Sequence, residues 1–320
     1  MSRQVTSLNH ASVALSGSSG FIGARLLQSL HSKHVSLGVF GRKFKFRKNT
    51  SFYFLDISDA KFFVESQVEG YDVFVHCAAR AHVMDESEAN PLATYLKANT
   101  YSTLRLAEQA AAAGVKRFIY LSSIKALGES TSLGSPFSHD SPLAPEDDYG
   151  VSKARAEEGL RDIAERTGME VTIIRPPLVY GKGVKANFAA MMDLAKKNLP
   201  LPLGSIKNKR SMVALDNLVD LIVTCIDHEN AGNRTFMVSD DKDVSTTELL
   251  QAMTRAHGKT PRLIPCPPSL IRLAATTLGK KAVAERLLGS LQVDIQYTKE
   301  QLNWTPKVKM ADVLKEMVND

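Results

Sequence analysis

The chain has 320 residues, 44% of them hydrophobic and 23% charged, which is enough for one large domain or two modest ones of ordinary globular composition. The net charge of +6 comes from basic residues that are dispersed except at 42–48 and 207–210, and this pattern argues against a nucleic-acid partner. There is no apolar run of ~18 residues, no signal-peptide pattern in 1–17 and no metal-like spacing of the three cysteines. We therefore expect a cytoplasmic protein without a membrane span or a metal site.

The first half of the chain alternates between short apolar runs and helical patterns. Strands are expected at 12–17, 34–40, 51–56, 71–79, 116–123 and 169–177, and helices at 20–32, 90–114 and 148–168. Strands that alternate with crossover helices predict an α/β fold with a parallel, doubly wound sheet. Because the strands are apolar throughout, we expect helices to cover both faces of this sheet.

The pattern changes after Pro177, where short segments, prolines and glycines accumulate. We interpret residues 1–178 as a dinucleotide-binding domain and residues 179–210 and 241–320 as a smaller substrate-binding lobe. The two are expected to be interleaved, because 211–240 again contains runs that look like sheet core and would complete the large sheet.

Three glycines, Gly17, Gly20 and Gly23, follow the first predicted strand and begin the first predicted helix. Glycine lets the backbone pass close to a phosphate, and the N-terminus of the helix then stabilises the negative charge. The sequence therefore predicts a dinucleotide site that includes the intervening Phe21 and Ile22. The alternative is a tight turn with close packing of the helix.

Other cofactor contacts are expected where neighbouring strands end. Asp56 follows the third predicted strand, where an acid can accept a hydrogen bond from the adenine amino group, and Ile57 is its neighbour. A loop residue without that role is the alternative for Asp56. Ala78 and Ala79 end the fourth predicted strand and are included in the predicted cofactor site.

Tyr149 and Lys153 are four residues apart and share one face of a predicted helix. A phenol with a pKa of ~10 is a poor acid–base catalyst at neutral pH. A nearby ammonium favours the phenolate and lowers its pKa, and the lysine could also hold ribose hydroxyls of the cofactor. Ser123, at the end of the fifth predicted strand, could hydrogen-bond the same substrate oxygen as the tyrosine.

Together these motifs resemble the extended short-chain dehydrogenase/reductases, in particular the NAD-dependent epimerases, dehydratases and ketoreductases of nucleotide sugars. The matching stretches, in family order, are "SGSSGFIG", "LD" at 55–56, "HCAA", "KANTYSTLRLAEQA", "LSSIKALG", "YGVSK", "RPPLVYG", "RSMVALDNLVD" and "LNWTPKVKMADVLKE". The resemblance implies a Rossmann-type fold and an active site of Ser123, Tyr149 and Lys153. It also implies a structural role for Asn99 and a homodimer formed by helices 91–113 and 149–166.

For the smaller lobe, the resemblance implies a site for a UDP-sugar. Asn187 matches a residue that contacts the diphosphate, and Arg210 matches the family's diphosphate-binding arginine. The planar guanidinium suits this role because it makes paired hydrogen bonds. The stretch 199–204, including Leu201, matches the segment that lies along the uracil.

The resemblance also indicates a reaction. The family's 4,6-dehydratases have an Asp-Glu pair after the catalytic strand, and "SSIKALG" has none, which argues against a dehydratase. Arg42 and Lys43 stand where NAD-using members have an acid and would attract a 2′-phosphate, so NADP is favoured slightly over NAD, with use of both cofactors as an alternative. An exposed basic loop pinned by Phe44 and Phe46 is the alternative.

NADPH that is released and replaced in each turnover would serve as a reductant. We therefore expect reduction of the C4 ketone of a UDP-linked 6-deoxy-4-keto-hexosamine. The likeness is to 4-ketoreductases of the UDP-N-acetylquinovosamine type, which serve bacterial surface-polysaccharide synthesis. The alternatives are a UDP-hexose 4-epimerase with retained NAD, a reductase of a small non-nucleotide ketone, and a non-catalytic NADP-sensing module.

Overall fold

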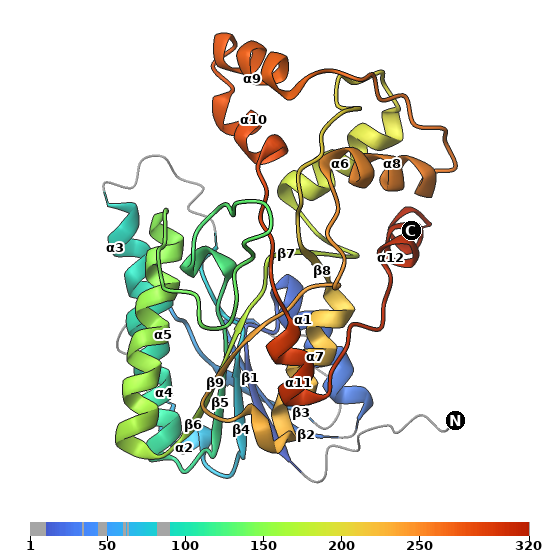
Figure 1. Ribbon diagram of the computed structural model, residues 1–320. Coiled ribbons are helices and arrows are strands. Elements are labelled where there is room, and N and C mark those ends of the chain that lie inside the picture. The colour runs from blue at the N-terminus through green and yellow to red at the C-terminus, as the bar shows by residue number, and fades with distance from the viewer. Residues whose placement is uncertain are drawn as a thin grey trace.

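The fold is taken from a computed structural model, which describes residues 11–33, 35–43, 50–59, 62, 64–81 and 90–319. It consists of a three-layer body and a smaller helical lobe above one edge of the body's central sheet (Figure 1). In these residues no helix has the length and apolar character needed to cross a membrane.

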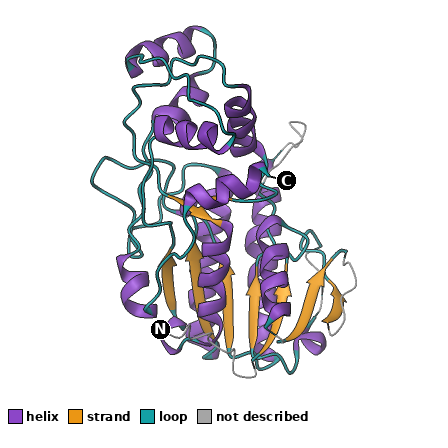
Figure 2. Ribbon diagram, turned by 90° about the vertical axis from the view of Figure 1, so that its right-hand side faces the viewer, coloured by secondary structure: helices purple, strands orange, loops and turns teal. Residues whose placement is uncertain are grey.

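A seven-stranded parallel sheet forms the centre of the body, with the order β3-β2-β1-β4-β5-β6-β9 (Figure 2). The strands are β1 (Ser12–Ser16), β2 (Ser36–Gly41), β3 (Thr50–Phe54), β4 (Val73–His76), β5 (Arg117–Leu121), β6 (Glu170–Arg175) and β9 (Arg234–Met237). The chain moves outward from β1 to β3 and then returns to the other side of β1 with β4. This reversal confirms the predicted doubly wound α/β fold, and the carboxyl ends of β1 and β4 lie at the switch point where such sheets bind ligands.

Helices cover both faces of the sheet. The helices α2 (Glu65–Val68), α4 (Ser102–Ala112) and α5 (Asp148–Thr167) cover one face, and their core contains no residue beyond Ile173. The other face is covered by α1 (Phe21–Ser32), α7 (Leu215–Asp227) and α11 (Gln296–Leu302), and its core extends to Trp304.

Two expected elements differ from the structure. The run 211–228 was interpreted as sheet core, but only β8 (Met212–Ala214) is a strand and the rest forms α7. Nine of the 13 residues of α7 are buried, and the others, Asp216, Asp220, Thr224 and Asp227, form a polar stripe at helical spacing that the sequence interpretation missed. The expected helix 90–114 is divided into α3 (Pro91–Tyr95), a π-helical segment η1 (Leu96–Tyr101) and α4.

The smaller lobe has its own apolar core. It contains the helices α6 (Ala186–Lys197), α8 (Thr246–Ala256), α9 (Pro268–Thr277), α10 (Lys281–Leu288) and α12 (Met310–Val318). The strand β7 (Leu178–Tyr180) pairs with β8 and lies where the lobe joins the body. A cluster that includes Tyr180, Phe188 and Leu249 is separate from the two clusters of the sheet. On these packing grounds we propose the division into a cofactor domain and an interleaved lobe.

Short 3₁₀ turns complete the described elements: η2 (Ile124–Ala126) follows β5, and η3 (Glu229–Ala231) precedes β9. Residues 289–295, which connect α10 to α11, run between two other segments. Leu291 pairs with Lys209 and Ser211 through backbone hydrogen bonds, and Phe137 pairs with Gln292 and Asp294. This connection therefore ties the loop 129–147 to the smaller lobe.

Candidate active site

The glycine turn directly follows β1, at the point where the strand order reverses. Gly17 has φ +80°, and a Cβ there would lie 2.5 Å from the Ala78 nitrogen. A Cβ at Gly23 would lie 2.2 Å from the Gly17 oxygen. Both glycines are thus required by close backbone packing between the turn, α1 and the segment after β4.

The same turn has the features that a dinucleotide requires. Gly20 is the exposed N-cap of α1 and provides no side-chain hydrogen bond to the helix. The first N–H groups of the helix, including those of Phe21 and Ile22, have no intrahelical acceptor and can bind an anion. Ala78 and Ala79 are half-buried, and the Ala78 nitrogen lies beside this turn.

Arg42 and Lys43 are exposed directly after β2, at the carboxyl end of that strand. Asp56 accepts hydrogen bonds from the nitrogen and hydroxyl of Ser58, at 2.9 and 2.7 Å. These bonds, with a smaller effect of Arg42, hold the pKa of Asp56 below its ordinary value. The carbonyl of Ile57 accepts a bond from Ser102. Phe44 and Phe46 lie outside the described residues.

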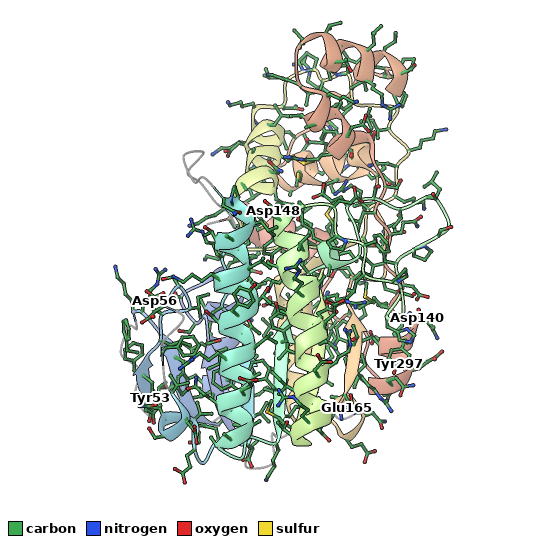
Figure 3. The ribbon with its side chains drawn as sticks, turned by 90° about the vertical axis from the view of Figure 1, so that its left-hand side faces the viewer. Tyr53, Asp56, Asp140, Asp148, Glu165 and Tyr297 are labelled. Carbon is green, nitrogen blue, oxygen red and sulfur yellow. The ribbon has the colours of Figure 1, made fainter. Side chains whose placement is uncertain are left out.

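Tyr149 occupies the first turn of α5, at the end of that helix facing the smaller lobe (Figure 3). The Asp147 side chain caps the helix by accepting a bond from the Gly150 nitrogen at 2.7 Å. Burial, with smaller effects of Asp147 and Tyr95, raises the pKa of Tyr149 well above its ordinary value, and hydrogen bonding with Ser123 acts in the opposite direction. The structure therefore brings the predicted serine and tyrosine together.

Lys153 lies one turn further along α5 and is almost fully buried. Its Nζ donates to the Leu121 carbonyl at 2.8 Å and lies 5.9 Å from the centre of the Tyr149 ring. Burial lowers its pKa to about 7, although Cys77 and Glu157 act to raise it. At neutral pH the lysine is thus only partly protonated, which limits the expected lowering of the Tyr149 pKa.

Asn99 lies in the π-helical segment and stabilises the site from outside it. Its side-chain oxygen accepts from the Arg80 nitrogen at 2.8 Å, and its amide donates to the Arg80 carbonyl and to the Ser152 hydroxyl, each at 3.0 Å. Single π-helical turns occur often at functional sites. Here the turn places Asn99 between the segment after β4 and the helix that carries Tyr149.

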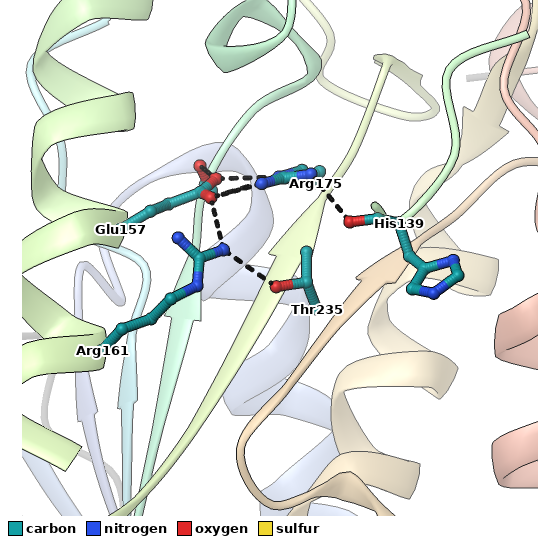
Figure 4. Close-up of polar contacts among 6 residues, drawn as sticks. His139, Glu157, Arg161, Arg175 and Thr235 are labelled. Carbon is teal, nitrogen blue, oxygen red and sulfur yellow. Dashed lines mark hydrogen bonds and ion pairs between the residues drawn. The ribbon is translucent and has the colours of Figure 1, made fainter. Parts of the chain in front are cut away.

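A buried ion pair behind the catalytic residues was not expected from the sequence. The carboxylate of Glu157 accepts two bonds from the Arg175 Nε, at 3.0 and 3.2 Å, and one from its Nη2, at 2.7 Å. It also accepts from the Ser122 hydroxyl at 2.6 Å and from Arg161 at 3.2 Å. Figure 4 shows Arg175 between Glu157 and the His139 carbonyl. Lys153 and Glu157 are four residues apart and therefore share one helix face. This spacing was the feature of the sequence that could have indicated a buried charge near the active site.

The three residues predicted for the substrate lie outside the cofactor domain. Asn187 is exposed in the first turn of α6, and Leu201 is paired through its backbone with Arg262 and Ile264. Arg210 is half-buried, and its Nη1 donates to the carbonyls of Arg286, at 2.9 Å, and Gly289, at 3.3 Å. Burial lowers the pKa of Arg210. The structure thus anchors Arg210 by the start of the 289–295 connection.

Comparisons with known proteins show which family this chain belongs to. The model of the NAD dependent epimerase/dehydratase family matches residues 13–239. A protein of Vibrio cholerae described as UDP-glucose 4-epimerase is 47% identical over 308 residues, which are 95% of this chain and 94% of the relative.

Solved structures show the same fold at lower identity. The UDP-glucose 4-epimerase of Thermotoga maritima, with UDP-glucose, has a TM-score of 0.76 at 22% identity, over 96% of this chain and 97% of that one. The UDP-glucuronic acid 4-epimerase of Bacillus cereus, in complex with NAD, has a TM-score of 0.77 at 18% identity, over 96% of both chains. These matches confirm the resemblance found in the sequence, and the chain is an enzyme that belongs to the NAD-dependent epimerase/dehydratase family of nucleotide-sugar enzymes.

Proposed function

We propose that this enzyme is a UDP-hexose 4-epimerase that retains NAD. The sequence favoured a 4-ketoreductase, with the epimerase as the alternative. The relative at 47% identity over 95% of the chain is described as an epimerase, and this observation carries the preference for the alternative. Ser123, Tyr149 and Lys153 at the carboxyl ends of the strands support chemistry at a sugar hydroxyl or ketone.

The cofactor would be held by the glycine turn at Gly17, Gly20 and Gly23, with its pyrophosphate at the start of α1 and its ribose near Lys153. When bound, the nicotinamide supplies the group that accepts hydride from C4 and returns it. The exposed N-cap of α1 and the backbone cradle around Gly17 support this placement.

Tyr149 is the proposed acid–base residue. Its phenolate oxygen takes the proton of the C4 hydroxyl as the sugar is oxidised, and returns it when the ketone is reduced on the opposite face. The hydroxyl of Ser123 orients the same oxygen. In its protonated form Lys153 would stabilise the phenolate, since its Nζ lies 5.9 Å from the centre of the Tyr149 ring and is held in position by the Leu121 carbonyl.

For the substrate, we propose that Arg210 and Asn187 bind the diphosphate and that the segment around Leu201 lies along the uracil. The Arg210 side chain is already held by the Arg286 and Gly289 carbonyls, so its guanidinium loses little freedom on binding. We also propose a homodimer through α4 and α5, which pack side by side on one face of the sheet (Figure 3).

The test is conversion of UDP-glucose to UDP-galactose by the purified enzyme without added cofactor. Conversion is expected, and Tyr149→Phe is expected to reduce it roughly 100-fold or more while cofactor binding is unchanged. No conversion, with stoichiometric loss of NADPH or NADH on a UDP-linked 4-keto sugar, would show that the enzyme is the ketoreductase instead.

One observation favours the reductase as the second candidate. Arg42 and Lys43 are both exposed at the end of β2. In enzymes that use NAD, an acidic residue near this position hydrogen-bonds the ribose hydroxyl. Comparison of the affinities for NAD and NADP tests this directly. A preference for NADP in the wild-type enzyme supports a cofactor that exchanges during turnover.

A further inference from the structure

The two helices α9 and α10 form a hairpin at the tip of the smaller lobe, on the far side of that lobe from the sheet (Figures 1 and 2). In α9 no residue is buried, although its sequence is rich in aliphatic residues. Four large aliphatic side chains on and beside the hairpin helices are exposed: Leu270 by 55%, Leu273 by 62%, Leu278 by 73% and Val283 by 50%. A group of exposed apolar side chains of this kind indicates an interaction surface for a protein or a membrane.

The exposed leucines lie on one face of the helix. Leu270, Leu273 and Leu278 follow the spacing i, i+3 and i+8, and Ala274 fills the position i+4 between them. The neighbouring face contains Ile271, which packs against the core of the smaller lobe. The smaller lobe therefore covers the Ile271 side of the helix, whereas Leu270 and Leu273 stay exposed.

Cations border this apolar face. Residues 268–288 contain four basic side chains, Arg272, Lys280, Lys281 and Arg286, and one acidic side chain, Glu285. Glu285 is paired with Arg272 across the two helices at 3.2 Å. Lys280 and Lys281 are exposed at the turn of the hairpin, after Leu278 and Gly279. The apolar face thus ends in two adjacent positive charges.

We propose that the α9–α10 hairpin docks this enzyme on an anionic membrane surface. Amphipathic helices that lie in a lipid–water interface combine an apolar face with lysines or arginines beside it. The leucines would enter the boundary between headgroups and acyl chains, and the lysines would contact the anionic headgroups. The hairpin projects from the lobe, so a flat surface can reach it without contact with the sheet.

A second copy of the chain is a poorer occupant of this face. A two-fold interface brings the same patch of both subunits together, so Lys280 and Lys281 of each copy would approach those of the other. Like charges that face one another in a desolvated interface are destabilising. The charge of the hairpin is instead complementary to a surface of negative charge.

The test is co-sedimentation of the full-length enzyme with vesicles of phosphatidylcholine alone or of phosphatidylcholine with phosphatidylglycerol. We expect binding to the anionic vesicles only, weakening as salt is raised. The double variant Leu270→Glu with Leu273→Glu should bind at least roughly 10-fold more weakly, because each leucine loses its apolar burial. Lys280→Gln with Lys281→Gln should weaken binding by roughly 10-fold or more while the apolar face is intact.

Leu133→Glu is the matched control, because Leu133 is 66% exposed in the loop 129–147 and lies outside the hairpin. It should bind vesicles like the wild type. The proposal is overturned if the wild type does not bind anionic vesicles, or if the hairpin variants bind as well as the control. Self-association that the leucine variant abolishes, without vesicle binding, would assign the face to a second copy.

Discussion

Replacing Glu157 by glutamine tests the importance of the buried ion pair behind the active site. Both Glu157 and Arg175 are almost completely buried, with 0% and 2% of their side chains exposed. Glutamine keeps the shape of the side chain and one acceptor oxygen. It removes the negative charge and places an N–H₂ group against the donors of Arg175.

The magnitude follows from what remains after the change. In Glu157→Gln the Arg175 guanidinium stays buried without a counter-charge, and removal of one partner of a buried pair costs about 3–5 kcal/mol of the free energy of unfolding. The remaining bond of Arg175 to the His139 carbonyl does not supply a charge. Glu158→Gln, at the exposed neighbouring position on α5, should change stability by less than about 0.5 kcal/mol.

Urea unfolding followed by circular dichroism measures both variants under the same conditions. The catalytic effect is read from the pH dependence of kcat/KM. The charge of Glu157 raises the pKa of Lys153, so its removal should move the alkaline loss of activity to lower pH. Equal stability of the two variants, with unchanged pH profiles, would refute the reasoning for Glu157.

Three further predictions concern the cofactor site. Gly17→Ala should lose more stability and more cofactor affinity than Gly168→Ala, because both glycines have positive φ but only at Gly17 would the Cβ collide with backbone; thermal unfolding and cofactor titration compare them. Lys153→Met should abolish turnover and stabilise the fold by up to about 5 kcal/mol below pH 7. The folded-state pKa of about 7 lies below the ordinary 10.5, so wild-type stability should rise between these pH values, and urea unfolding against pH should show no such rise in the variant. Arg42→Glu should weaken NADP binding relative to NAD by roughly 10-fold or more, and an unchanged ratio of the two dissociation constants would remove Arg42 from the ribose site.

Local patterns in the sequence were sufficient to predict the three-layer body of the fold. The strands of the large sheet from β1 to β6 are short apolar runs between turn residues, which the sequence pattern predicts. The glycines of the first turn could be recognised because the backbone geometry of that turn requires glycine at their positions. By contrast, α7 was wrongly expected to be sheet material, because its apolar runs were given more weight than the polar stripe of Asp216, Asp220 and Thr224. The π-helical turn at Asn99 also could not be predicted from hydrophobic periodicity. Tertiary contacts determine where a helix takes up one extra residue in a turn.

The catalytic set was predictable in part, for a related reason. Tyr149 and Lys153 are one helical turn apart, so their proximity follows from the sequence alone. The ion pair joins Glu157 on α5 to Arg175 on β6, and only the packing of that helix on the sheet brings them together. The lowered pKa of Lys153 likewise depends on burial, which no local pattern specifies.

The two cores of the sheet are completed at very different points of the chain. The residues beneath α4 and α5 are all present once Ile173 has been synthesised, whereas the core beneath α1 and α7 includes Val293 and Trp304. A chain that emerges from the ribosome in order can therefore close one face of its sheet early and must keep the other open for more than a hundred residues. During synthesis, we expect the apolar face that waits for α7 and α11 to stay partly exposed to water and to other chains until those helices have been made.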